Sequence, residues 1–295
     1  MRVTNKMIAQ TVLNNLGTNL NRLQKLQGQM SSLQVVSKMS DDPAVATRVV
    51  NLNSVLSRSE QYERSLNDAK GWLETTESTL SNVTDVLQRA RELAVYGANG
   101  TLDQTDLETI EVEVEQIIGN MVQLANTSYA GRYIFGGTLT TAVPFDADGN
   151  YSGNTGSDGQ LDWEISQGVT MTVNIDGNTA FIDNGVFSAL SDLKTHLESG
   201  ETETIGNTDL AALDDAINGI VNLRSLLGAK TKRVEVILNS TWDEKLNYEG
   251  LRSSLNDIDL AKVVTEFKMQ ENVYNAALNV GARIILPSLV NFLKA

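Results

Sequence analysis

Side chains that could perform acid–base or metal chemistry are scarce in this chain of 295 residues. It contains one histidine, His196, and no cysteine. Thiolate chemistry, disulfides, Cys/His zinc sites and a His-Glu-x-x-His metallopeptidase motif are therefore excluded. His196 lies in the segment Lys194-Thr195-His196-Leu197-Glu198, which is typical of a helix surface. We expect a structural or solvated role for it.

Two glycine-containing segments resemble ligand loops only superficially. An EF-hand calcium loop needs Gly at its sixth position and Glu at its twelfth. Counted from Asp146, the segment Asp146-Ala147-Asp148-Gly149-Asn150 has Gly at the fourth position, and the twelfth residue is Ser157. The segment from Gly131 to Gly137 is not followed by the Lys of a phosphate-binding P-loop. We therefore predict a turn at the first segment, and no catalytic residue, cofactor or metal for the chain, which we do not expect to be an enzyme.

Charge and hydropathy exclude further classes. The net charge of −14 argues against binding to nucleic acid, which depends on clustered Lys and Arg. No stretch approaches the ~20 apolar residues of a membrane helix, and amides interrupt the start of the chain where a signal peptide would be apolar. The charge is uneven, because residues 1–40 carry five basic and no acidic side chains, while 41–250 carry about −20. The ends of the chain thus differ chemically from its middle.

Apolar residues alternate at spacings of three and four along five stretches, which indicates long amphipathic helices. Three of these stretches predict the helices of a rod. Their apolar stripes are Leu66, Ala69, Leu73, Thr76, Leu80, Val83, Leu87, Ala90 and Ala94; Leu107, Ile110, Val114, Ile117, Met121 and Leu124; and Leu210, Leu213, Ile217, Ile220, Leu227, Val234, Leu238 and Thr241. The terminal stripes are Leu13, Leu16, Leu20, Leu23 and Met30 at one end, and Leu260, Val264, Phe267, Tyr274, Leu278, Ile285, Leu289 and Phe292 at the other.

The pattern also predicts where the longest helix starts and stops. Ser40-Asp41-Asp42-Pro43 combines capping side chains with Pro in the first turn, and Asn99-Gly100 is a break. A helix from Ala44 to Tyr96 would be roughly 80 Å long, at 1.5 Å per residue. Such a rod needs neighbours of similar length.

Between Tyr133 and about Asn184 the period changes to short alternating runs such as Thr170–Ile175. Asp-Gly dipeptides at 148–149, 158–159 and 176–177 predict hairpin turns. We therefore predict a mainly α fold, a long antiparallel helical rod built from both chain halves, with a small β-rich inserted domain. The expected domains are a terminal coiled-coil assembly domain (1–40 and 256–295), a helical rod domain (41–131 and 209–255) and the inserted domain (132–208).

Two terminal helices alone cannot cover all their apolar side chains, so we expect part of them to pack on neighbouring copies. The predicted subunit-assembly interface comprises Leu13, Leu16, Leu20, Leu23, Met30, Val264, Phe267, Tyr274, Leu278, Ile285, Leu289 and Phe292.

Several segments resemble the flagellin superfamily. They are Met1-Arg2-Val3-Thr4, Ser40-Asp41-Asp42-Pro43, Leu73-Glu74-Thr75-Thr76-Glu77-Ser78-Thr79-Leu80 and 87–95. Asn126-Thr127 followed by Gly131-Arg132-Tyr133-Ile134-Phe135-Gly136-Gly137-Thr138, and the ending 286–293, are similar to the hook-associated protein 3 family, the hook-filament junction proteins. In that family Ser-Ser is commonly followed by Gly, where this chain has Leu33 after Ser31-Ser32. We expect the bend between terminal helix and rod to be made differently or nearer Ser37.

The resemblance implies a structural adaptor of the bacterial flagellum that joins the hook, through hook-associated protein 1, to the flagellin filament. It implies contact with copies of itself and with an export chaperone at the C-terminal helix, and export through the flagellar type III pathway without a cleaved signal peptide. The alternative is flagellin itself, the self-polymerising filament subunit. The resemblance also makes Arg89, Arg91 and Glu92 a possible rod contact, against the simpler interpretation of a solvated face with helical ion pairs.

Overall fold

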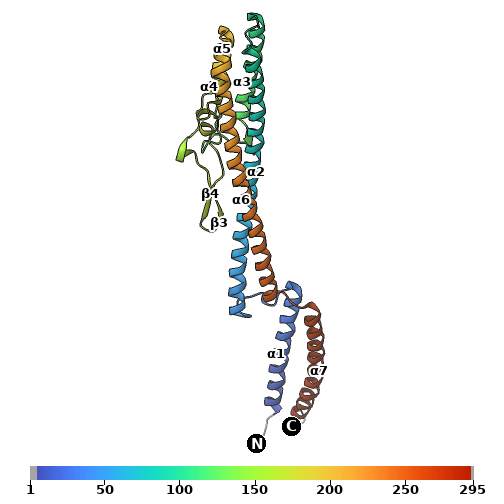
Figure 1. Cartoon of the computed structure of the whole chain (residues 1–295). Coiled ribbons are helices and arrows are strands. Elements are labelled where there is room, and N and C mark those ends of the chain that lie inside the picture. Colours follow the sequence, from blue (N-terminus) through green and yellow to red (C-terminus); the bar gives the residue numbers. More distant parts are fainter. Residues whose placement is uncertain (1–4, 294–295) are drawn as a thin grey trace. The chain divides into compact units, whose positions relative to one another are not determined.

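The structure, a computed structural model, describes the backbone of residues 5–293 and the side chains of residues 7–283 (Figure 1). The chain divides into two compact units, one formed by 1–59 with 244–295 and the other by 60–243. Helices dominate both, so the mainly α fold with long helices from both chain halves is confirmed. The helices of the first unit are α1 (Asn5–Ser32) and α7 (Leu260–Leu293), and α2 (Pro43–Gly97) and α6 (Leu210–Asn256) contribute residues to both units.

The second unit is built around α2, α3 (Gln104–Ala125) and α6, and the predicted rod stripes form its core. On α6 the residues spaced by seven, Leu213, Ile220, Leu227 and Val234, are completely buried. The same spacing of seven occurs on α2, where the completely buried residues are Leu66, Leu73, Leu80, Leu87 and Ala94. A seven-residue repeat keeps one face of a helix turned toward its neighbours, which is why periodicity alone locates this core.

The boundaries of α2 follow from local chemistry. Asp42 accepts hydrogen bonds from the backbone N–H groups of Ala44 and Val45 at 3.0 and 3.1 Å, which satisfies donors that have no partner inside the helix. Pro43 is the first helical residue, as expected for a residue without an N–H. After the break near Asn99, Asp103 caps α3 in the same way through the N–H of Asp106.

The segment between α3 and α6 holds two small antiparallel sheets and further helices. β1 (Ser128–Tyr129) pairs with β2 (Arg132–Tyr133), and β3 (Asp162–Ser166) pairs with β4 (Val169–Thr172). The helical elements are η1 (Gly156–Gly159), η2 (Asn178–Ile182), α4 (Val186–Ser199), α5 (Thr202–Thr204) and η3 (Ile205–Asp209). The division of the chain into three domains remains a prediction.

Only one of the three Asp-Gly dipeptides makes a hairpin-like turn. Gly149 has φ 80°, and Phe145 bridges Tyr151 across the turn. Asp158-Gly159 lies in η1, Asp176-Gly177 leads into η2, and the β3–β4 hairpin turns at Gly168, with φ 71°. The predictions for the other two dipeptides were therefore wrong, because Asp-Gly also suits the start and end of short helical turns.

Aromatic rings hold this segment together. Phe181 packs against Phe135, Phe145 and Phe187 at ring-centroid distances of 5.0, 5.3 and 5.8 Å. Phe135 and Phe181 are completely buried. The pairs of Phe181 with Phe135 and Phe145 are edge-on, at interplanar angles of 86° and 75°, and such pairs contribute beyond their buried area.

Candidate subunit-assembly interface

The terminal helices α1 and α7 pack along each other through one face of each. In α1, Val12 and Leu16 lie against Gly281 of α7, where a Cβ would approach the Val12 side chain to 2.9 Å. Gln270 donates to the side-chain carbonyl of Asn19 at 3.2 Å. The α1–α7 pair therefore mixes an apolar seam with an amide contact, as expected for helices with amide-rich flanks.

The predicted stripe of α1 is split by this packing. Leu16, Leu23 and Met30 are half-buried, whereas Leu13 and Leu20 remain 53% and 40% exposed. Leu26, which flanks the predicted stripe and was not placed in the interface set, is 9% exposed and is the best covered of the α1 side chains that the structure describes. A single partner helix can cover only one of the two sets that alternate along the stripe.

The stripe of α7 divides in the same way. Phe267 and Tyr274 are half-buried, but Val264 and Leu278 are 36% and 42% exposed. Sequence reasoning missed three further exposed apolar residues, Met269, Val273 and Val280. The remaining members of the predicted set, Ile285, Leu289 and Phe292, lie outside the side chains that the structure describes.

The connection after α1 is made by backbone pairing with the segment after α6. Val35 donates its N–H to the carbonyl of Asn256 at 2.6 Å, and Ile258 donates to Leu33 at 3.3 Å. The side chain of Asn256 accepts the N–H of Val36 at 3.1 Å, and both residues are buried. Residues more than 200 positions apart are thus fixed next to each other at the base of the terminal helices.

Leu33 itself makes the bend that ends α1. Its φ is 58°, in the left-handed region where glycine is favoured and other residues are strained, and its side chain is 56% exposed. Of the two expected alternatives, a bend made differently and a bend nearer Ser37, the structure has the first, because the bend lies at Leu33 and is made without glycine. A helix commonly ends on a left-handed residue, and that geometry is kept here although the glycine is absent.

The two units differ in net charge. The first unit holds 13 basic and 8 acidic residues, and the second holds 10 basic and 29 acidic residues. Helix α1 itself contains basic but no acidic side chains, whereas its neighbour α7 contains Glu266 and Glu271. The surface of α1 disfavours contact with another basic surface and favours neutral or acidic neighbours.

The candidate rod residues are paired within the chain. Arg89 donates to Glu113 of α3 at 2.7 and 2.8 Å and to Glu92 at 3.0 Å, and Arg91 donates to Asp214 of α6 at 2.6 Å. The hydrogen bonds that Arg89 donates to Glu113 raise the pKa of Arg89, and those that Arg91 donates to Asp214 raise the pKa of Arg91. These ion pairs join α2 to both neighbouring helices at an exposed surface, where solvent screening keeps the contribution of each one small. Contact of Arg89, Arg91 and Glu92 with another subunit stays a prediction.

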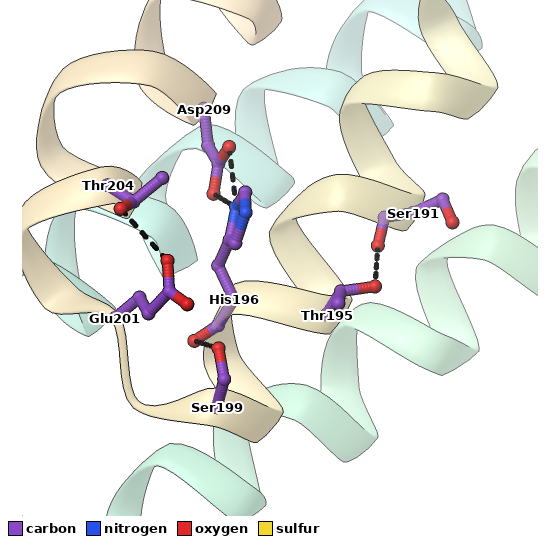
Figure 2. A network of polar contacts seen from close by, with 7 residues as sticks. All are labelled: Ser191, Thr195, His196, Ser199, Glu201, Thr204 and Asp209. Atoms are coloured by element: carbon purple, nitrogen blue, oxygen red, sulfur yellow. Dashed lines mark hydrogen bonds and ion pairs between the residues drawn. The ribbon is translucent and has the colours of Figure 1, made fainter.

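His196 has a specific structural partner that the sequence did not reveal. Figure 2 shows its ring beside Asp209, with Nδ1 at 2.9 and 3.0 Å from the two carboxylate oxygens. Asp209 is 1% exposed, so the ring satisfies a carboxylate that has almost no access to water. The hydrogen bond to Asp209 raises the pKa of His196. The pair links the last turn of α4 to the final residue of η3, directly before α6.

The acidic loop is a turn, as predicted. Asp146 accepts hydrogen bonds from the backbone of Asp148 and Asn150 at 3.0 and 2.8 Å and from the Asn150 side chain at 3.0 Å. These hydrogen bonds, the Asn150 side chain first, lower the pKa of Asp146. Among the residues that the structure describes, no three His, Asp or Glu side chains are grouped as metal ligands. None of the helices in that part of the chain is long and apolar enough to cross a membrane.

Comparison with known families identifies this helical arrangement. The bacterial flagellin N-terminal helical region matches residues 3–140, and the bacterial flagellin C-terminal helical region matches residues 210–293. The chain belongs to the flagellin superfamily. Within that superfamily it is of the hook-associated protein 3 type.

The relatives that support this assignment match nearly end to end. The chain is 28% identical to flagellar hook-associated protein 3 of Salmonella typhimurium over 304 residues, covering 94% of this chain and 95% of that protein. It is 27% identical to a flagellin of Bacillus subtilis over 286 residues, with 90% of each covered. Among solved structures, FlgL of Bacillus cereus is 26% identical with a TM-score of 0.60, covering 69% of this chain and 99% of that one. Members of this family are structural proteins of the flagellum.

Proposed function

We propose that this chain is a structural adaptor at the hook-filament junction, joining the hook to the flagellin filament so that the filament can grow. The observation that carries the proposal is the split of the terminal stripes, which leaves Leu13, Leu20, Val264 and Leu278 exposed on paired helices. The nearly full-length match to flagellar hook-associated protein 3 of Salmonella typhimurium supports the junction assignment.

Assembly in this proposal is driven by burying the exposed apolar residues of α1 and α7. Helices α1 and α7 of neighbouring subunits bury the exposed stripes against each other in an axial tube, and the rods stack on adjacent layers. Each fully buried Leu contributes about 1.5–3 kcal/mol relative to exposure, so several small contacts per subunit sum to a stable ring. Acid-free α1 fits this role because it need not desolvate carboxylates in the contact.

We further propose the partners: hook-associated protein 1 toward the hook, flagellin toward the filament, copies of this chain within a layer, and an export chaperone that covers α7 before assembly. An exposed apolar stripe on a helix is the surface that a groove-binding chaperone would recognise. The export route without a cleaved signal belongs to the same proposal.

The decisive experiment is deletion of the gene. We expect cells with hooks, without filaments, and with monomeric flagellin in the medium. A strain that still grows full filaments would reject the junction assignment. Long filaments formed by the purified protein alone would favour the alternative, flagellin.

A point variant tests the interface itself. Leu20→Asp places a charge in a contact that excludes water, so the variant should fold normally and fail to restore filaments to the deletion strain. Asn15→Asp adds the same charge at an exposed polar position of α1 and should restore them. Normal swimming with Leu20→Asp would remove this stripe from the mechanism.

A further inference from the structure

Lys230 of α6 differs from the other lysines of the second unit. Its Nζ donates to the backbone carbonyl of Asn174 at 3.3 Å, and it has no carboxylate within ion-pair distance among the described residues. Burial lowers its pKa, against a smaller opposing effect from the charge of Asp162. Asp176 lies in the same pocket, but its oxygens accept from Thr179 at 2.8 and 3.1 Å.

The other three lysines of this unit form ion pairs with carboxylates. Lys70 lies 3.7 and 3.6 Å from Glu74 and Glu235, and Lys232 lies 3.3 Å from Glu235. Lys194 lies 3.3 and 3.2 Å from Glu111 and Glu115, which raise its pKa. Because only the neutral amine is nucleophilic, ion pairing suppresses the reactivity of these three.

Space for a small substituent is present beside Lys230. A pocket of about 320 Å³ lies between the inserted segment and α6, lined by Thr172, Ile175, Leu223 and Leu226 as well as Lys230. An acyl group on Nζ would enter a partly apolar pocket, and the resulting amide would keep one N–H for the Asn174 carbonyl. Acylation would also remove a charge that this half-buried position disfavours.

We propose that Lys230 is the preferred site in the second unit for modification by small activated acyl groups such as acyl phosphates. The neutral Nζ attacks the acyl carbon, the bond from that carbon to the phosphate oxygen breaks, and phosphate leaves. The surplus proton of the amine passes to solvent as the amide forms. No enzyme or further co-reactant is needed for this exchange.

Acetyl phosphate applied to the full-length protein at pH 8 tests the proposal. Fragment-ion mass spectrometry assigns each acetyl group to Lys230, Lys232, Lys70 or Lys194. Lys232 is the matched control, since it lies two residues away on the same helix and is 75% exposed. We expect Lys230 to react several times faster than Lys232, because burial lowers the pKa of Lys230 and so raises its fraction of neutral amine, whereas Lys232 is paired with Glu235.

The same reaction in concentrated urea distinguishes the effect of the folded structure on the two acetylation rates from the effect of the local sequence. The two rates should become nearly equal, because unfolding removes both the burial of Lys230 and the ion pair of Lys232. Equal or faster reaction at Lys232 in the native protein would overturn the proposal. A preference for Lys230 that persists in urea would overturn it as well, because the pocket would then play no part.

Discussion

The side-chain carbonyl of Asn256 accepts the backbone N–H of Val36 at 3.1 Å across 220 positions of sequence. Both residues are buried, so water cannot replace the bond if it is lost. We expect Asn256→Ala to destabilise the first unit by about 1–3 kcal/mol, the cost of leaving a buried donor unsatisfied. Hydrogen exchange at residues 33–38 would measure it, with the exposed Asn53→Ala as a control that should leave exchange unchanged.

Replacing the strained residue that ends α1 should stabilise the protein. Leu33→Gly removes a left-handed strain of roughly 1–2 kcal/mol, while glycine costs about 0.5–1 kcal/mol in chain entropy. The net expectation is a gain of about 0.5–1 kcal/mol in unfolding free energy. Leu13→Gly, at another exposed leucine of α1, should lose about 1 kcal/mol instead. A loss at both positions, measured by urea unfolding, would contradict the strain at Leu33.

Replacing each of two helical glycines of the second unit by alanine should change stability in opposite directions. A Cβ on Gly71 would collide with the ring and hydroxyl of Tyr129, whereas a Cβ on Gly119 would meet nothing within 4 Å. We expect Gly71→Ala to cost about 1–3 kcal/mol as an overpacked contact. Gly119→Ala should stabilise by about 0.5–1 kcal/mol through helix propensity. Thermal unfolding of the two variants checks the pair, and a similar shift for both would refute the contact with Tyr129.

The pair of His196 and Asp209 makes stability depend on pH. Asp209 raises the pKa of His196 above its unfolded value of about 6.5. The stabilisation is therefore complete below about pH 6.5 and is lost as pH rises through the folded pKa. The other charged groups that favour the protonated ring are Glu201 and Asp192. Urea unfolding between pH 5.5 and 9 should show this decline in the wild type but not in His196→Gln, and identical profiles would exclude the histidine as its source.

The sequence predicted the long helices well because their rules are local and repetitive. Leu66 to Ala94 and Leu213 to Val234 follow a period that fixes which face is buried, whatever the neighbouring helix. The cap at Asp42 was equally readable, since it depends on adjacent residues. These features required no knowledge of the tertiary structure.

What the sequence did not reveal depends on contacts between distant segments. The left-handed Leu33 is held by pairing with residues near 258, and no local signal marks a leucine for that conformation. Asp209 gives no sign in sequence that it is buried against His196. Similarly, heptad spacing located the terminal stripes but did not distinguish Leu16, which faces α7, from Leu20, which does not.

The pairing of residues 33–36 with 256–258 also bears on the order of folding. Closing a flexible loop of 220 residues costs roughly 2 kcal/mol more than closing one of 24, the separation of Arg89 and Glu113. Once the second unit has formed, Lys70 and Glu235 are fixed 3.6 Å apart, and only about 55 flexible residues remain in the loop that joins Val36 to Asn256. That shortening recovers roughly 1 kcal/mol of closure entropy. We therefore expect the second unit to fold first and the base of the terminal helices to close after it.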